Sequence, residues 1–242
     1  MKKYFIKHKL TVGDITHLSD SDSELIISNK DVKVEDIIEV ETYEKIFLGQ
    51  ITDTANNSVE VEIIEEKGFR DTKYVPSITI IQSLSNDSKF NYFIEKSVEI
   101  GIEKIIPVES KYSLKNKKRA LKDYPLWNKI VKDATEQSRN IFPTIVEKPL
   151  DMEELSKYTF ENNATKICLA TENVETKYLS DIAIDNNPVY IAIGPEKGWS
   201  SLDIDILKNL DFQFIQLKGN ILRTETTGLV IGSIIKYMKG EI

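Results

Sequence analysis

The chain has few of the residues that hold metals, form disulfides or act as acids and bases at neutral pH. Cys168 is the only cysteine among 242 residues. No disulfide can therefore form within the chain, and a cytoplasmic location is expected. His8 and His17 are the only histidines. A zinc site of the Cys/His type and a catalytic triad built on histidine are both poorly supplied, so no metal is expected.

Long hydrophobic runs are also missing. No apolar stretch approaches the ~20 residues needed to cross a bilayer, so no membrane partner is expected. The first ten residues, MKKYFIKHKL, contain lysines but no long apolar core, which predicts that there is no secretory signal peptide. With 40% hydrophobic and 29% charged residues, the composition is that of an ordinary globular protein.

Charge is unevenly distributed along the chain. Residues 1–72 hold 9 Lys and Arg against 16 Asp and Glu, while residues 111–139 hold 9 basic and 3 acidic side chains. The acidic excess of residues 1–72 argues mildly against nucleic-acid binding. The basic stretch, here called the basic belt, could contact RNA phosphates, although such runs are usually solvated helix faces. Its candidate RNA-binding residues are Lys111, Lys115, Lys117, Lys118, Arg119 and Arg139.

The first 72 residues read as β-rich. Short apolar or alternating runs predict strands at residues 25–28, 37–42, 46–52 and 59–64, with a turn at residues 56–58. Such closely spaced short strands suggest a small barrel or sandwich. Residues 67–71 are predicted to be the linker that ends this domain.

After the linker, strands alternate with helices. Strands are predicted at residues 78–81, 105–108, 167–170, 189–193 and 212–217. A helix between the first two should end at Gly101, a basic helical stretch should break near Pro125 and resume over residues 127–139, and a last helix should cover residues 224–239. This alternation is typical of a mainly parallel sheet covered on both faces. The prediction is two domains, residues 1–72 and 73–242, the second of the α/β class.

One turn of the second domain is unusual. The apolar strand at residues 189–193 runs into GPEKG, and Ser200 with Asp203 forms a capping-box signal for the helix that follows. A strand, a glycine turn and a helix are typical of phosphate or nucleotide sites, but this turn carries Glu196 and fits neither phosphate-loop pattern. The glycines could also serve only to shape a tight turn.

The last predicted helix is the second unusual element. Gly228 and Gly232 lie inside its apolar stripe, each costing about 1 kcal/mol relative to alanine. They suggest close approach of another backbone, in a second subunit or within the chain. At the helix entrance, residues 223–226 cluster polar groups. An ordinary explanation is that Thr224 caps the helix and that Arg223 and Glu225 form a surface pair.

Taken together, these two elements resemble a known family. IGPEKG at residues 193–198 and LKGNILRTET at residues 217–226 are similar to the IGPEGG and LG-x-x-ILR-x-ETA motifs of the knotted SPOUT RNA methyltransferases. The branch they resemble methylates N3 of a uridine in small-subunit ribosomal RNA. Further similarity lies at Lys96, Glu99, Gly101, Pro107 and residues 136–138.

The resemblance implies a fold and a set of partners. It implies a small PUA-like β-barrel followed by an α/β SPOUT domain with a C-terminal trefoil knot. The cofactor would be S-adenosylmethionine, which has no phosphate and so needs no phosphate cradle. The protein would be a homodimer that completes each active site, and its substrate would be 16S ribosomal RNA within a small-subunit particle. Lys96 would join the basic belt in binding RNA.

Three loops of the knot would bind the cofactor in such a protein. They correspond to the end of the strand at residues 167–170, the glycine turn, and residues 217–222. The implied cofactor-binding residues are Leu169, Thr171, Glu172, Ile193, Gly194, Glu196, Gly198, Leu217, Gly219, Ile221, Leu222 and Thr226.

The implied catalytic residues are Arg223 and Glu225. Uracil N3 is protonated at neutral pH and must lose its proton, yet no histidine is near the motifs. Arg223 cannot act as a base, but its fixed cation can stabilise the uracil anion. Glu225 could accept the proton through water, or could only orient Arg223.

Two departures from the family pattern leave alternatives open. Lys197 stands where the family usually has a second glycine, and residues 17–22 are acidic where the family carries an arginine. The alternatives are a non-catalytic RNA-binding protein with the same fold, or a SPOUT methyltransferase acting on another RNA. An ordinary nucleotide-binding enzyme would need glycines after its first parallel strand, and residues 78–88 contain none.

Overall fold

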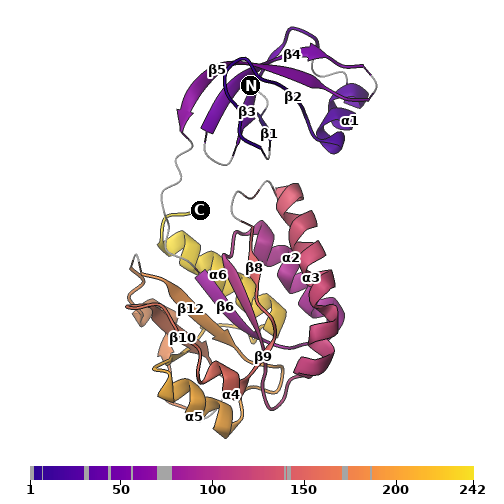
Figure 1. Ribbon diagram of the computed structural model, residues 1–242. Helices are drawn as coiled ribbons and strands as arrows, with labels where there is room; N and C mark the ends of the chain where they lie inside the picture. Colours follow the sequence, from indigo (N-terminus) through magenta and orange to yellow (C-terminus); the bar gives the residue numbers. More distant parts are fainter. Residues whose placement is uncertain are drawn as a thin grey trace. The chain divides into compact units, whose positions relative to one another are not determined.

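The computed structural model describes residues 3–6, 8–29, 33–42, 45–55, 57–69, 78–138, 140, 143–170, 174–185 and 187–242. The chain divides into two compact units, residues 1–74 and residues 75–242. Figure 1 shows both, with the first unit built on a small sheet and the second on a larger sheet flanked by helices.

Unit 1 is built on a five-stranded mixed sheet. Its strands lie in the order β1-β3-β4-β5-β2. β1 runs parallel to β3, and the other pairings are antiparallel, with register shifts at three places between β4 and β5. Its core includes Val40, Phe47 and Val61, none of which is exposed. The bounds are β1 (Lys3–Phe5), β2 (Ile15–His17), β3 (Ile37–Glu41), β4 (Lys45–Asp53) and β5 (Glu60–Phe69).

Two predictions in unit 1 are wrong. Residues 25–28 belong to a helix, α1 (Asp20–Asn29), and not to a strand. The helix begins where the Ser19 hydroxyl accepts the Asp22 N–H at 3.2 Å, and acidic residues in its first turn favour that end. The predicted linker also starts too early, because β5 continues to Phe69. Asn56, Arg70 and Asp71, parts of the predicted turn and linker, lie outside the described residues.

Unit 2 is built on an eight-stranded sheet. Its path is β11-β13-β10-β12-β6-β7-β8, and β9 also pairs with β7. Every pairing among these described strands is parallel, which confirms the predicted sheet type. The bounds are β6 (Ile78–Ser83), β7 (Lys104–Glu109), β8 (Ile145–Val146), β9 (Leu150–Asp151), β10 (Thr165–Leu169), β11 (Lys177–Tyr178), β12 (Val189–Ile193) and β13 (Gln213–Gln216).

Helices cover both faces of this sheet, so the α/β class is confirmed (Figure 1). On one face, Phe90, Trp127 and Ile231 join the core that includes Ile80 of β6. On the other, Leu155 and Leu207 join the core that includes Ile81. The first face carries α2 (Asp87–Glu99), α3 (Lys117–Ser138) and α6 (Thr224–Met238), and the second carries α4 (Met152–Leu155) and α5 (Ser201–Asn209). A short 3₁₀ turn, η1, spans Leu179–Asp181.

Two helix ends lie where the capping residues predicted them. α2 ends just before Gly101, whose φ of 75° lies in the left-handed region that favours glycine. α5 begins with the predicted capping box: the Ser200 hydroxyl accepts the Asp203 N–H, and the Asp203 carboxylate accepts the Ser200 N–H. These two predictions are confirmed.

The predicted break near Pro125 is wrong, since α3 is continuous through it. A proline inside a helix costs about 3 kcal/mol because it removes a hydrogen bond and crowds the preceding turn. Packing holds the helix on both sides of the proline: Tyr124 donates to the Val146 carbonyl at 3.2 Å, and the Trp127 ring lies 4.8 Å from that of Phe90. Tertiary contacts outweigh the local preference.

The two glycines of α6 face side chains of the same unit. A Cβ added at Gly228 would lie 2.7 Å from Cε2 of Phe93, and one at Gly232 would lie 2.8 Å from Cδ1 of Ile102. The expected close approach is real, but the neighbours are side chains and not another backbone. The glycines therefore serve internal packing of α6 against α2 and the segment after it.

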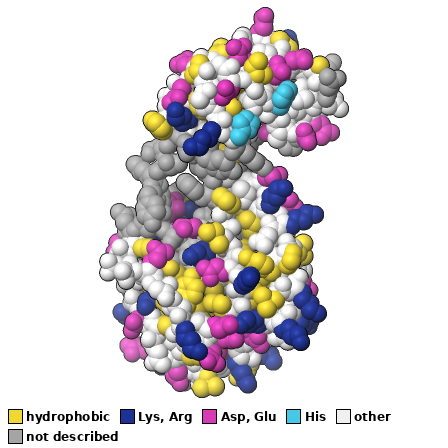
Figure 2. Space-filling model, in the orientation of Figure 1, with side chains coloured by type: hydrophobic (Ala, Val, Ile, Leu, Met, Phe, Trp, Pro, Cys, Tyr) yellow, Lys and Arg dark blue, Asp and Glu magenta, His cyan; other side chains and the backbone are white. Residues whose placement is uncertain are grey.

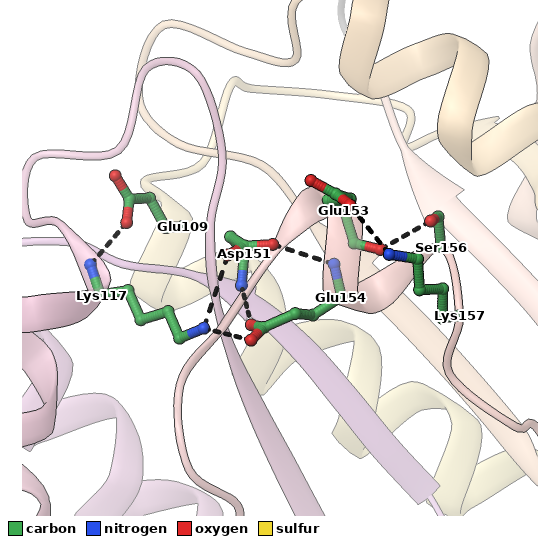
Figure 3. A network of polar contacts seen from close by, with 7 residues as sticks. All are labelled: Glu109, Lys117, Asp151, Glu153, Glu154, Ser156 and Lys157. Atoms are coloured by element: carbon green, nitrogen blue, oxygen red, sulfur yellow. Dashed lines mark hydrogen bonds and ion pairs between the residues drawn. The ribbon is translucent and has the colours of Figure 1, made fainter.

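A network of polar contacts anchors the start of α3 (Figure 3). The Lys117 N–H donates to Glu109 at 2.6 Å, and its ammonium contacts Asp151 at 3.4 Å and also Glu154. Asp151 and Glu154 form the capping box of α4. The Glu154 N–H, followed by the Lys117 charge, lowers the pKa of Asp151. The ion pair with Lys117 is the main cause that lowers the pKa of Glu154.

Candidate active site

A cavity of about 650 Å³ lies where three neighbouring strands of unit 2 end. β12, β10 and β13 are adjacent and parallel, so their carboxyl ends meet at one edge of the sheet. Leu169, Ile193 and Leu217, at or beside these ends, all line the cavity. Its volume lies in the ~300–1,000 Å³ range typical of small-molecule sites. Open α/β sheets bind ligands at this edge.

Most of the cofactor-binding residues implied by the motifs meet in this cavity. Thr226 does not line it: α6 presents Thr224 and Thr227, three residues apart on one helix face, in its place. Thr171 and Glu172 lie outside the described residues. The implied residues that do line the cavity are Leu169, Ile193, Gly194, Glu196, Gly198, Leu217, Gly219, Ile221 and Leu222.

Trp199 joins two of the loops. Its indole N–H donates to the Leu169 carbonyl at 3.1 Å, and a Cβ added at Gly194 would lie 3.0 Å from the same nitrogen. Gly194 therefore lets the turn close onto the indole. Trp199 is 3% exposed and lines the cavity. It was not predicted, although it directly follows the glycine turn.

Lys197 carries no backbone strain. In the part of the chain that the structure describes, the non-glycine residues with positive φ are Glu35, Asn57, Asn163 and Asp211. In the turn itself, the positive φ of 74° belongs to Gly198. A lysine is thus compatible with the turn at position 197, where its side chain is exposed.

The third loop leaves main-chain groups available to a ligand. Gly219 has a φ of 111°, and a Cβ built on it would meet no atom within 4 Å. Across the described residues, no main-chain N–H of residues 219–222 donates to a protein group. Backbone N–H groups need hydrogen-bond partners, so these groups can donate hydrogen bonds to the polar atoms of a bound molecule.

A buried hydrogen-bond chain ties the loops to the last helix. The Gln82 amide donates to the Thr224 hydroxyl at 2.8 Å, and that hydroxyl donates to the Gly194 carbonyl at 2.7 Å. Gln82 is 1% exposed at the end of β6. Thr224 thus fixes the start of α6 against the glycine turn. No motif indicated Gln82, which lies 142 residues before its partner.

Three charged side chains line the cavity. Lys89 of α2 forms an ion pair with Glu196 of the glycine turn, and Arg223 lies exposed at the start of α6. The hydrogen bond from Lys89 lowers the pKa of Glu196, and the charges of Lys89 and Arg223 act in the same direction. Glu196 is therefore a carboxylate at neutral pH. Lys89 was not predicted.

Glu225 takes a different position from the one expected of a surface pair. It is 9% exposed, it does not line the cavity, and its Oε2 has no hydrogen-bond partner among the described residues. Among the described residues, no ion pair joins Arg223 to Glu225. Its place in the first turn of α6 lets the helix dipole stabilise its negative charge.

The basic belt is only partly available to a ligand. Lys115 is 5% exposed and pairs with Asp87 and Asp123, so its assignment to an RNA surface is wrong. Lys117 is held in the network at the start of α3. Lys96 contacts Glu95 at 2.8 Å and Glu99 at 2.7 Å.

The other candidate RNA-binding residues of the belt are exposed, except for one that lies outside the described residues. That one is Arg139. Figure 2 shows Lys and Arg side chains interspersed with Asp and Glu along the edge of unit 2 that α3 covers. The exposed ones are Lys111, Lys118 and Arg119.

Neither a metal cluster nor a membrane-spanning helix is found in the described residues. No group of three or more His, Cys, Asp and Glu side chains there could hold a metal ion. No helix among the same residues is both long and apolar enough to span a bilayer.

Comparison with known proteins defines the class to which this fold and cavity belong. A family model described as an RNA methyltransferase domain matches residues 73–236, which contain every cavity-lining residue. The class is that of the RNA methyltransferases.

Individual relatives narrow the class. Ribosomal RNA small subunit methyltransferase E of Aquifex aeolicus (strain VF5) is 30% identical over 195 residues, 79% of this chain and 81% of the relative. The protein of that name from Buchnera aphidicola subsp. Schizaphis graminum (strain Sg) is 30% identical, over 99% of this chain and 97% of the relative. This chain belongs to the family of ribosomal RNA small subunit methyltransferase E, which confirms the resemblance seen in the motifs.

A solved structure shows the same fold over the whole chain. It is the ribosomal RNA small subunit methyltransferase E from Neisseria gonorrhoeae, bound to S-adenosyl methionine. It is 26% identical, with a TM-score of 0.74, covering 98% of each chain.

Proposed function

We propose that this protein is an S-adenosylmethionine-dependent methyltransferase that modifies N3 of a uridine in 16S ribosomal RNA. One observation carries the proposal: both family motifs, 25 residues or so apart in sequence, converge on one cavity beside an exposed arginine. The names of the relatives and the cofactor in the Neisseria structure support the class of reaction. The choice of N3 rests on the resemblance of both motifs to the branch of the family that methylates a uridine N3.

The walls and loops of the cavity fit S-adenosylmethionine. Its walls include Leu169, Ile193 and Leu217, which suit an adenine ring, and the loop at residues 219–222 offers free main-chain groups to its edge. Glu196 places a carboxylate in the cavity. A carboxylate disfavours a phosphate and stabilises a sulfonium cation.

Arg223 supplies the charge that a uridine N3 needs. Bound S-adenosylmethionine supplies a methyl group on a positively charged sulfur. Arg223 lines the cavity and is exposed, so its guanidinium can contact a base that enters. Loss of the N3 proton moves negative charge onto O2 and O4 of uracil, and a fixed cation stabilises that anion. Because arginine stays protonated, Arg223 cannot also take the proton.

We assign to Glu225 the role of accepting the proton that leaves N3 of uracil. Glu196 is engaged by Lys89, whereas one oxygen of Glu225 has no partner among the described residues. Glu225 does not line the cavity, so the proton would pass through an intervening water. The unpartnered oxygen of Glu225, with no ion pair to Arg223 among the described residues, favours this role over that of orienting the arginine.

Further parts of the proposal concern architecture and partners. Unit 1 would be a PUA-like barrel that binds RNA, which its curled mixed sheet supports. The three cavity loops would form a trefoil knot. Two copies would form a homodimer, supported by the exposed Tyr237 and Met238 at the end of α6. The RNA would be presented within a small-subunit particle.

The test is methyl transfer from radiolabelled S-adenosylmethionine to small-subunit particles purified from a strain that lacks this gene. Mass spectrometry of nuclease digests should give one 3-methyluridine per 16S RNA. Naked 16S RNA and large-subunit particles are the controls. Methylation of a different RNA would refute the substrate, and methylation of another atom would refute the role given to Arg223. Failure to bind the cofactor would leave a non-catalytic RNA-binding protein.

A further inference from the structure

The ion pair between Lys89 and Glu196 joins two elements that are far apart in sequence. Lys89 lies in the first turn of α2, and Glu196 lies in the turn after β12, 107 residues later. The Lys89 N–H donates to the Asn86 side chain at 3.0 Å, so the helix cap fixes the backbone that carries the ammonium. Both residues line the cavity.

Stability alone gives little reason for this pair. The Lys89 side chain is 20% exposed and that of Glu196 is 43% exposed. Ion pairs with such exposure contribute little to folding, because water screens the charges and long side chains lose freedom. Opening the pair therefore costs little, and each charge can exchange its partner for a group on a ligand.

We propose that Lys89 and Glu196 together bind the amino-acid end of S-adenosylmethionine. Lys89 would take the α-carboxylate, and Glu196 would take the α-ammonium. The inference rests on the proposed function and adds the residues that recognise this end of the cofactor.

Charge matching supports the assignment. Lys89, Glu196 and Arg223 are the charged side chains among the described residues that line the cavity. Arg223 is assigned to the uracil. The adenine and ribose are neutral and suit the apolar walls and main-chain groups. The carboxylate of the ligand then pairs with Lys89, and its ammonium pairs with Glu196. When the Lys89–Glu196 pair opens, each of the two side chains gains a new partner, and no charge is left unpaired.

This assignment predicts a difference between two ligands. S-adenosylhomocysteine carries the amino-acid end, and 5′-methylthioadenosine replaces that end with a methyl group. Neither has a charged sulfur, so a comparison of the two isolates the contribution of the carboxylate and ammonium. The wild-type protein should bind S-adenosylhomocysteine more tightly, by on the order of 100-fold for two charge-assisted contacts.

The experiment is calorimetric titration of the full chain with both compounds. Lys89→Met and Glu196→Gln should each weaken S-adenosylhomocysteine by on the order of 10-fold, with 5′-methylthioadenosine binding unchanged. The matched control is Lys197→Met, which removes an exposed lysine from the same turn and should leave both affinities unchanged.

Two results would count against the proposals, and they are distinct. If both ligands bind the wild-type protein but Lys89→Met and Glu196→Gln leave their affinity ratio unchanged, the assignment of these residues is wrong while the proposed function stands. If neither ligand binds the wild-type protein at millimolar concentration, the proposed function itself is wrong, and this inference with it. Retained 5′-methylthioadenosine binding in a variant shows that the variant has folded.

Discussion

At the scale of single residues, Arg223 is the side chain most directly tied to the proposed chemistry. It precedes α6 at the N-cap position, where its backbone is extended and its side chain caps nothing. A residue in this position is dispensable for the helix. Its value lies in the charge it presents to the cavity.

Arg223→Ala should therefore leave folding and cofactor affinity nearly unchanged. We expect single-turnover methylation to fall by on the order of 100-fold or more, because a contact to developing charge is lost in the transition state. Rapid-quench measurements with saturating cofactor test this. Arg223→Lys is the matched variant and should recover only part of the rate, since an ammonium lacks the planar fork of donors. A wild-type rate in Arg223→Ala would end the assignment.

Gly194 offers a second test at this scale. A side chain at this position would press on the Trp199 indole, which in turn holds the Leu169 carbonyl. We expect Gly194→Val to abolish binding of S-adenosylmethionine, measured by calorimetry, because the cavity loops can no longer close. Lys197→Gly, three residues on, should bind normally, since Lys197 has no positive φ. Tight binding by Gly194→Val would show that the loops tolerate the bulk.

The predicted site residues that line the cavity are mostly those that stand together in a motif. The glycine turn and residues 217–222 were found because each is contiguous, and their convergence follows from parallel strands. Lys89 and Gln82 were missed because each joins the site from an ordinary strand or helix more than 100 residues away. Thr226 was misplaced for a local reason: the helix phase, set by the start of α6 at Thr224, turns it off the cavity.

At the scale of elements, α6 shows how a helix can tolerate internal glycines. Gly228→Ala should gain about 1 kcal/mol in helix propensity. It should lose more, about 1–3 kcal/mol, because the new Cβ overlaps the buried Phe93 ring. Urea unfolding should thus show net destabilisation. The same change in a Phe93→Leu background should cost less, and equal costs in both backgrounds would contradict the packing role.

The polar network at the start of α3 predicts a response to acid. The pKa values of Asp151 and Glu154 are lowered in the folded protein. A carboxyl group whose pKa is lower in the folded protein than in the unfolded chain stabilises the fold at pH values above the unfolded pKa. That stabilisation is lost as the pH falls through the pKa of the folded protein. Lys117→Met removes the main cause of the lowered pKa of Glu154. The variant should therefore lose less stability than the wild type between about pH 5 and pH 3. The difference should be less than about 1 kcal/mol, because these side chains are partly exposed to water.

Urea unfolding at pH 7 and at pH 4 measures this difference. Lys118→Met, at the next position and exposed, is the matched control and should follow the wild-type pH dependence. A parallel acid response in Lys117→Met and wild type would show that the network does not set these pKa values.

Helices and strands were predictable from sequence where the hydrophobic pattern agreed with the turn and capping residues at their ends. The parallel strands of unit 2 are apolar runs between helices, and all of the main ones were found. The strand predicted at residues 25–28 failed because an apolar run of three fits a strand or one helix face equally well. The break at Pro125 failed because the contacts of Tyr124 and Trp127, invisible in the sequence, hold the helix together.

At the scale of the whole molecule, the proposed function requires an acidic protein to bind RNA. The net charge is −7, and two lysines of the basic belt, Lys115 and Lys117, are engaged by carboxylates. Of the candidate RNA-binding residues of the belt, Lys111, Lys118 and Arg119 remain exposed. Changing all three to glutamine should weaken RNA binding and flatten its salt dependence by roughly 2–3 logarithmic units of slope, at ~0.9 or less per phosphate contact.

Filter binding across a salt series measures that slope. A triple glutamine variant at Lys148, Lys157 and Lys208, which are exposed elsewhere in unit 2, changes net charge equally and is the matched control. If both triple variants lower affinity by the same amount, the effect belongs to net charge, and the belt makes no direct phosphate contacts.

The hydrogen-bond chain from Gln82 through Thr224 to Gly194 has a consequence for synthesis of the protein. Unit 1 has its own core and leaves the ribosome first, so it can fold while the rest is still being made. The cavity cannot, because its floor needs residues 217–227 as well as the strands that precede them. A nascent chain that ends at residue 216 contains every described strand of the sheet but lacks the cavity-lining residues of 217–227. Assembly of the cavity therefore waits for a segment that is made after all of these strands.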